Sequence, residues 1–139
     1  MQLGMVGLGR MGANMVRRLM KAGHRCVVYD RDAARTQELA REGAMAAAAI
    51  DQFISALEPP RVVWVMVPAG PPTEDVLAAL AERMQLGDIL IDGGNSYYKD
   101  DVRRARQKKP KGIQYLDVGT SGGVWGLERG YCLMIGGTQ

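Results

Sequence analysis

Hydrophobic residues along the chain fall into two kinds of run. Short continuous runs are typical of strands buried on both faces of a sheet, and they lie at 3–6, 25–29, 61–67, 89–91, 114–118 and 131–135, with a weaker run at 45–48. Runs with helical spacing alternate with them, at 10–20, 33–41, 51–57, 73–84 and 100–109. Asp51 and Thr73 are predicted to cap two of these helices. The alternation predicts an α/β fold, a doubly wound, mostly parallel sheet with helices on both faces.

Length and composition fit a single globular domain. The chain has 139 residues, and 47% of them are hydrophobic, which is ordinary for a protein with a packed core. The two cysteines, Cys26 and Cys132, occupy apolar, strand-like positions, so we expect reduced core thiols and a cytoplasmic location. Neither a signal-peptide pattern nor an apolar run of membrane-spanning length is present, so no membrane partner is expected.

The charge pattern gives little support to nucleic-acid binding. The net charge is +3, and acidic and basic residues are interspersed along most of the chain. A basic run, RRARQKKPK at 103–111, is the exception. It fits the solvated face of one helix and lacks interleaved aromatic residues, so no nucleic-acid partner is expected. Binding to nucleic acid that weakened steeply with salt would favour the opposite reading.

The first predicted turn carries a phosphate-binding pattern. GLGRMG places Gly7, Gly9 and Gly12 between the first strand and the first helix, as G-x-G-x-x-G. Gly7 permits the tight turn, Gly9 allows the backbone to approach a pyrophosphate, and Gly12 lets the helix pack close to the strand. An acidic residue, Asp30, ends the next predicted strand, as this motif requires. Together these features predict a Rossmann-like dinucleotide-binding domain over residues 1–139.

Three charged residues bear on the choice between NAD and NADP. The carboxylate of Asp30 can accept hydrogen bonds from ribose hydroxyls and would repel a 2′-phosphate, and Asp32 adds to that repulsion. The guanidinium of Arg31 could instead pair with a phosphate or stack on the adenine. Two carboxylates against one guanidinium favour NAD, with NADP possible.

Three further loops follow predicted strands and therefore meet the fingerprint turn at one edge of the sheet. The loop 67–69, formed by Val67, Pro68 and Ala69, is expected to line the nicotinamide-side ribose. Asn95, which follows Gly93 and Gly94, offers a donor and an acceptor to a cofactor and a substrate at once. Ser121 with the amides of Gly122 and Gly123 would form a small anion-binding nest. Each of the last two segments alone also fits an ordinary turn.

Four segments together resemble a known family. They are GLGRMG, MVPAG, DGGNSYYKDD and DVGTSGGVWGLERGYCLMIGG, in that order along the chain. They look like the N-terminal coenzyme domain of decarboxylating 6-phosphogluconate dehydrogenase, in its shorter-chain, NAD-preferring branch. The resemblance implies an oxidoreductase of the pentose phosphate pathway and of gluconate utilization. Its substrate would be 6-phosphogluconate, which it would convert to ribulose 5-phosphate with reduction of NAD or NADP. The full-length protein is then expected to be a homo-oligomer.

The resemblance also assigns roles to residues. Gly7, Leu8, Gly9, Arg10, Met11 and Gly12 would hold the pyrophosphate, with Met11 near the nicotinamide. Asn95 would contact both cofactor and sugar acid, and the preceding glycines would let the backbone come close enough to the ligand. Ser121, Gly122 and Gly123 would hold the carboxylate end of the substrate. No metal is implied.

The resemblance places catalysis outside this chain. In the family the catalytic lysine and glutamate lie on a helix of a C-terminal helical domain that is absent from residues 1–139, so we expect a fragment with no catalytic residue of its own. Where the longer-chain enzymes have a glutamate after SGG, Val124 and Trp125 stand here. Apolar surface left without its helical domain would favour self-association. The alternatives are another 3-hydroxyacid dehydrogenase of the same superfamily and a non-catalytic NAD-binding module.

Overall fold

Seven strands form one sheet in the computed structural model, which describes residues 1–137 except the side chain of Tyr98. The strands are β1 Gln2–Val6, β2 Arg25–Tyr29, β3 Met45–Ala46, β4 Val62–Val65, β5 Ile89–Asp92, β6 Gln114–Ser121 and β7 Cys132–Gly137. Their order is β3-β2-β1-β4-β5-β6-β7. All neighbours are parallel except β6 and β7, which pair antiparallel. The predicted Rossmann-like, mostly parallel sheet is therefore confirmed.

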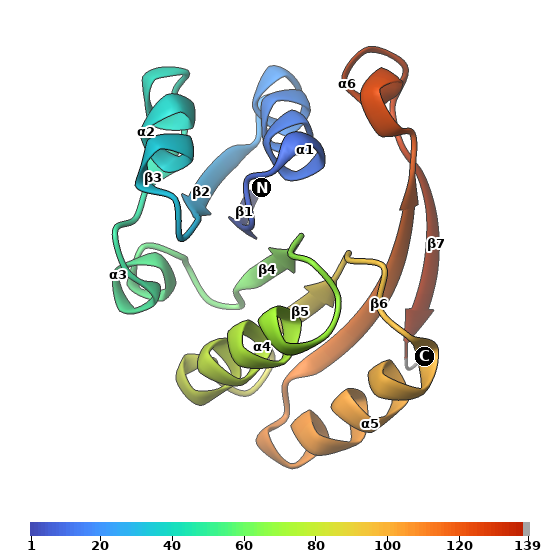
Figure 1. Cartoon of the computed structure of the whole chain (residues 1–139). Helices are drawn as coiled ribbons and strands as arrows, with labels where there is room; N and C mark the ends of the chain where they lie inside the picture. The colour runs from blue at the N-terminus through green and yellow to red at the C-terminus, as the bar shows by residue number, and fades with distance from the viewer. Residues whose placement is uncertain (138–139) are drawn as a thin grey trace.

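Helices cover both faces of this sheet. They are α1 Arg10–Lys21, α2 Ala33–Arg41, α3 Ile50–Ser55, α4 Pro71–Arg83, α5 Tyr98–Lys108 and α6 Gly126–Arg129, with 3-10 turns η1 Lys109–Lys111 and η2 Gly123–Trp125. Figure 1 shows α1 and α2 on one side of the sheet and α3, α4 and α5 on the other. Each face therefore buries its own set of apolar side chains.

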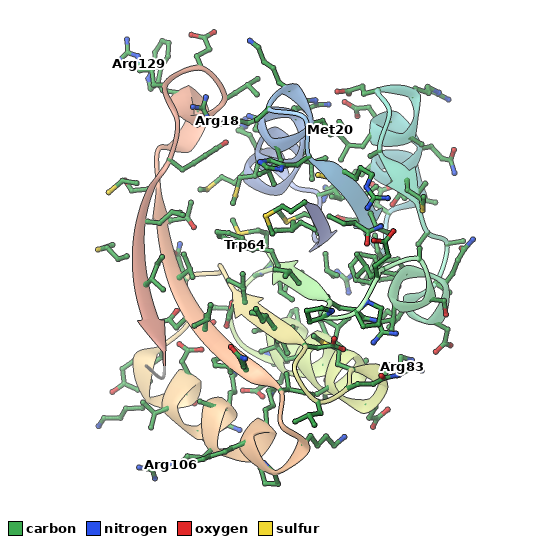
Figure 2. All side chains as sticks on the ribbon, turned by 180° about the vertical axis from the view of Figure 1, so that it is seen from behind. Arg18, Met20, Trp64, Arg83, Arg106 and Arg129 are labelled. Atoms are coloured by element: carbon green, nitrogen blue, oxygen red, sulfur yellow. The ribbon has the colours of Figure 1, made fainter. Side chains whose placement is uncertain are left out.

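The continuous apolar runs reflect these two cores. On β4, Val63 and Val65 pack with α3 and α4, whereas Trp64 between them packs with the core on the α1 and α2 face. Successive side chains of a strand point to opposite faces, so a strand covered on both faces needs an apolar residue at every position. Figure 2 shows Trp64 in the middle of the molecule.

The two predicted helix caps are wrong. α4 begins at Pro71, after Gly70 with φ +92°, and Thr73 lies inside the helix, where its hydroxyl donates to the carbonyl of Pro68 at 2.8 Å. Proline is suited to the first helical position because its φ is already helical and it has no N–H to satisfy. α3 begins at Ile50, and Asp51 lies in its first turn, where it pairs with Arg83.

The β6–β7 hairpin differs most from expectation. β6 runs three residues past the predicted end at 118. β7 is an edge strand, and its Leu133, Met134 and Ile135 side chains are exposed. Cys132 is exposed too, so the prediction of a core thiol holds only for Cys26. Arg18 of α1 anchors α6 by donating to the carbonyl of Leu127 at 3.1 Å (Figure 2).

The basic run at 103–111 is only partly solvated. Arg106 points away from the sheet (Figure 2), but Arg104 and Lys108 are buried, so the prediction of a uniformly solvated face is wrong. The ammonium of Lys108 lies 5.4 Å from the centre of the Tyr115 ring. Among the helices of the described residues, none has the length and apolar character needed to cross a membrane.

Candidate dinucleotide-binding site

A cleft of about 680 Å³ opens at the carboxyl ends of the central strands. Ten of the predicted cofactor residues line it: Gly7, Gly9, Met11, Gly12, Asp30, Arg31, Val67, Pro68, Ala69 and Asn95. Leu8 and Arg10 do not, because the Leu8 side chain is buried in the core and Arg10 is exposed outside the lining. Within the described residues, no cluster of His, Cys, Asp and Glu is arranged to hold a metal ion.

An added side chain would meet different surroundings at each of the three fingerprint glycines. Gly7 has φ +91°, and a Cβ there would lie 2.3 Å from the backbone oxygen of Met66. A Cβ on Gly12 would lie 2.0 Å from the backbone oxygen of Gly7, so only glycine lets α1 pack this close to the turn. A Cβ on Gly9 would meet no protein atom within 4 Å. The space above Gly9 is therefore open toward the cleft.

The start of α1 suits an anion. Its N-cap is Gly9, no side chain caps it, and its first turn contains no acidic residue. The first intrahelical bond runs from the Ala13 amide to the Gly9 carbonyl, at 2.9 Å. Helix N-termini present amide donors and the positive end of the helix dipole, which together bind phosphate. The uncapped start of α1 and the open space at Gly9 therefore fit a dinucleotide pyrophosphate.

Asp30 joins the fingerprint turn to the end of β2. Its Oδ2 accepts from the Leu8 amide at 2.6 Å, and its Oδ1 accepts from the Asp32 amide at 2.8 Å. Each carboxylate oxygen has two lone pairs, so both oxygens keep capacity for ribose hydroxyls. Leu8, predicted as a cofactor residue, thus contributes its backbone to the placement of Asp30.

Arg35 is a lining residue that the sequence prediction missed. Its Nη1 lies 3.7 Å from Oδ2 of Asp30, and its Nε lies 3.5 Å from Oδ2 of Asp32. Asp32 is the N-cap of α2, because it accepts from the Ala34 amide at 3.0 Å. Arg35 stands three residues after that cap, so helical spacing could have identified it. Its guanidinium partly neutralises the acidic end of the cleft.

In the loop after β5, Gly93 and Gly94 are packed too closely against neighbouring residues to carry a side chain. A Cβ on Gly93 would lie 2.0 Å from Nε1 of Trp64, and one on Gly94 would lie 2.9 Å from the backbone oxygen of Val67. Neighbouring protein atoms therefore already exclude a side chain at both positions. Both glycines also line the cleft, and their role in the approach of a ligand stays a prediction. Asn95 follows them, exposed and within the cleft lining.

Beneath this loop lies a buried ion-pair network that the sequence prediction also missed. Nη1 of Arg104 lies 3.1 Å from Asp92 Oδ2 and 2.9 Å from Asp101 Oδ1, and Nη2 lies 2.7 Å from Glu74 Oε1. The Tyr115 hydroxyl donates to Asp101 at 2.7 Å. Burial raises the pKa of Asp101, whereas the hydrogen bond from Arg104 lowers the pKa of Glu74. The members of the network come from four elements, α4, β5, α5 and β6, so only the position of Asp92 at the end of an apolar strand indicated it.

The predicted anion nest lies at the end of β6, outside the cleft lining. Ser121 is the last residue of the strand and is exposed, while Thr120 before it lines the cleft. Gly122 and Gly123 have φ values of +145° and +47°, which glycine adopts readily. Substrate binding by Ser121, Gly122 and Gly123 stays a prediction.

Asp117 on β6 provides a pH-dependent test of the network. Burial, and then repulsion by Asp101 and Asp92, raises its pKa. A carboxyl with a raised pKa in the folded state stabilises the fold fully below its unfolded pKa and loses that contribution as pH rises through the folded pKa. Asp117→Asn mimics the protonated form, so we expect a higher melting temperature at neutral pH and a difference that closes on acidification. Thermal unfolding across pH measures this, with Glu128→Gln as the exposed charge control; a constant difference would contradict it.

The comparisons with known proteins agree with this geometry. Residues 2–139 match the family model described as the NAD binding domain of 6-phosphogluconate dehydrogenase. A Bacillus subtilis protein with the provisional name 6-phosphogluconate dehydrogenase YqeC is 44% identical over 99% of this chain. The NAD(+)-dependent, decarboxylating 6-phosphogluconate dehydrogenase of Haloferax volcanii is 41% identical over 100% of it. The chain spans 46% of the length of each relative, which is about half.

Solved structures give the same relationship. Plasmodium falciparum 6-phosphogluconate dehydrogenase, a structure described with its cofactor NADP+ and its substrate 6-phosphogluconate, has a TM-score of 0.92 at 31% identity, over 100% of this chain and 31% of its own. Mycobacterium tuberculosis 3-hydroxyisobutyrate dehydrogenase has a TM-score of 0.86 at 25% identity, over 99% and 47%. A family match over nearly the whole chain, on a cleft built as a dinucleotide site, leads to one conclusion: the chain belongs to the family of NAD-binding domains of 6-phosphogluconate dehydrogenase.

Proposed function

We propose that this chain is the cofactor domain of an NAD-dependent, decarboxylating 6-phosphogluconate dehydrogenase. The observation that carries the proposal is the Asp30 carboxylate, fixed by two backbone amides beside the uncapped start of α1. This arrangement suits a dinucleotide whose ribose hydroxyls are free. The identity of 41% with an NAD(+)-dependent relative supports it.

The residues of the cleft divide the work of binding. The amides at the start of α1 hold the pyrophosphate, Asp30 accepts from the ribose hydroxyls, and Val67–Ala69 form the wall beside the second ribose. Asn95, exposed at the cleft, orients cofactor and sugar acid through its donor and acceptor. When bound, the nicotinamide would accept the hydride that leaves C3 of 6-phosphogluconate. Oxidation and decarboxylation then yield ribulose 5-phosphate.

Proton transfer needs groups from elsewhere in the protein. The oxidised hydroxyl requires a base, and the enediol that follows decarboxylation requires an acid. Among the described residues that line the cleft there is no lysine or histidine. We infer that the base and the acid are the lysine and the glutamate that the family resemblance places in a helical domain outside residues 1–139. The exposed apolar strand β7 supports assembly of the whole protein into a homo-oligomer through surfaces near it.

A second candidate is another 3-hydroxyacid dehydrogenase. The fold match to 3-hydroxyisobutyrate dehydrogenase favours it, because that enzyme is named for the oxidation of another 3-hydroxy acid. A non-catalytic NAD-binding module would present the same cleft. Turnover of the full-length protein with 6-phosphogluconate and with short 3-hydroxy acids separates the three.

Cofactor preference can be measured on this chain alone. We expect NAD to bind more tightly than NADP, because a 2′-phosphate beside Asp30 would face a carboxylate at short range. Asp30→Asn should reduce the ratio of the two affinities at least about tenfold, equivalent to ~1.4 kcal/mol. Calorimetric titration with each cofactor at fixed ionic strength gives the ratio. The ratio is the right quantity because any loosening of the fingerprint turn affects both cofactors alike.

Arg31→Ala is the complementary variant. It should weaken NADP more than NAD, because only NADP offers this guanidinium a 2′-phosphate. Equal or tighter binding of NADP by the unmutated chain would show that Arg31, with Arg35 near it, governs this end of the cleft and that the reading of Asp30 is wrong.

A further inference from the structure

Asp92 accepts hydrogen bonds from the residues on both sides of Asn95 in the loop after β5. It is the last residue of β5, fully buried, and each of its oxygens accepts from the loop. Oδ1 accepts from the Gly94 amide at 3.0 Å, and Oδ2 accepts from the Ser96 hydroxyl at 2.7 Å. Gly94 and Ser96 are the two neighbours of Asn95 in the chain. A single carboxylate therefore fixes the backbone before Asn95 and the side chain after it.

Arg104 holds that carboxylate in place. Arg104 is 1% exposed, and its Nη1 lies 3.1 Å from Oδ2 of Asp92. The same guanidinium bonds Asp101 on its own helix and Glu74 on α4, so it is fixed from three directions. A buried carboxylate without a cation would tend to take up a proton or turn toward water, and either would release one of the loop donors. Arg104 thus pairs with the Asp92 carboxylate and keeps it oriented toward the loop.

A second buried ion pair, next to the other end of β5, shows what is particular to Asp92. Asp88, which immediately precedes β5, pairs with Arg61 at 3.1 Å and is equally buried. Its carboxylate accepts from the Arg61 amide at 2.7 Å and the Gln85 amide at 2.8 Å, at the opposite end of the strand from the cleft. Both pairs stabilise the sheet, but only the Asp92 pair connects to a residue of the cleft.

We propose that Asp92 and Arg104 are positioning residues for Asn95. Arg104 orients Asp92, Asp92 clamps Gly94 and Ser96, and the amide of Asn95 is thereby presented to the cleft in one orientation. The part of this inference that concerns cofactor affinity rests on the proposed function; the clamp itself does not. The Ser96 hydroxyl, which donates to Asp92, acts in the clamp and leaves Asn95 as the polar contact to the ligand.

The clamp can be tested without any ligand. Hydrogen exchange of the Gly94 amide, followed by NMR, should be at least about tenfold faster in Asp92→Asn and Arg104→Met once global stability is taken into account. Arg104→Lys should restore part of the protection, because a lysine still supplies the charge. Asp88→Asn is the matched control and should leave Gly94 unchanged. Ser96→Ala removes one tether without uncovering a buried charge, and a smaller loss in the same direction is expected. Unchanged exchange at Gly94 in Ser96→Ala and Asp92→Asn would overturn the clamp.

A double-mutant cycle tests whether the clamp acts through Asn95. Asp92→Asn should weaken binding of NADH about tenfold, as read by cofactor fluorescence, and should have no further effect in an Asn95→Ala background. Asp88→Asn should not change the affinity. Additive losses would show that Asp92 acts on something other than Asn95 and would overturn the positioning role. An unmutated chain that binds neither NADH nor NADPH would contradict the proposed function instead, and hydrogen exchange would still decide the clamp.

Discussion

Gly9→Ala is expected to weaken NAD binding at least about tenfold while leaving the free energy of unfolding nearly unchanged. A methyl group on Gly9 meets no protein atom within 4 Å, and the backbone there, with φ −63° and ψ −175°, accepts alanine. The methyl group instead fills the space in which a pyrophosphate would approach the start of α1. Binding is therefore lost without a cost to the fold.

Gly12→Ala provides the contrast, because it should impair both properties. Its Cβ would lie 2.0 Å from the Gly7 oxygen, a backbone atom that can move only if α1 lifts away from β1. Overpacking of this kind typically costs about 1–3 kcal/mol or more. Thermal unfolding together with calorimetric titration of NAD measures both effects for each variant. If Gly9→Ala bound NAD as tightly as the unmutated chain, the phosphates would not approach the backbone at Gly9.

The second large effect is expected from Arg104→Met, which should lower the free energy of unfolding by about 3–5 kcal/mol. The substitution leaves Asp92 and Asp101 buried without the guanidinium that compensates their charge. Urea denaturation with linear extrapolation measures the loss. Part of it should be recovered at acidic pH, because protonated carboxyls no longer need a cation.

Arg103→Met is the control for this prediction. Arg103 is the preceding residue on α5 and bonds the same oxygen of Glu74, at 2.6 Å, but its side chain is 47% exposed. An ion pair in water contributes little, so stability should hardly change. Equal losses for the two variants would show that contact with Glu74, rather than the buried carboxylates, accounts for the role of Arg104.

The fold and most of the residues that line the cleft could be predicted because the signals for them are local. A strand buried on both faces is apolar at every position, as Val63–Val65 are, and this distinguishes it from a helix. The fingerprint glycines and Asp30 lie at the ends of such strands, where a parallel sheet brings its loops together. For these features, neighbours in sequence determine neighbours in space.

The features that escaped prediction depend on partners distant in the chain. Arg104 and Lys108 are typical of a solvated basic helix, yet Glu74 and Asp92 provide a buried setting for Arg104 from other segments. The apolar composition of β7 indicated a core strand, but the described part of the chain leaves both its faces exposed. The predicted start of α4 was wrong for a simpler reason. Thr73 is a typical cap residue and Pro71 is typical of the first helical position, so the two residues predict different starts for the same helix.

The hydrogen bond between Asp30 and the Leu8 amide links two properties that a protein engineer would wish to change separately. The residue proposed to set the preference for one cofactor also orders the loop proposed to bind the pyrophosphate that both cofactors share. A single substitution of Asp30 should therefore lower both the selectivity and the affinity for the cofactor. A variant with this substitution alone, as the first step in changing the preference from NAD to NADP, would bind both cofactors poorly. A productive route would first install another acceptor for the Leu8 amide and only then remove the charge. We therefore expect the coupling to act as a barrier to changing the cofactor preference by substitution of Asp30 alone.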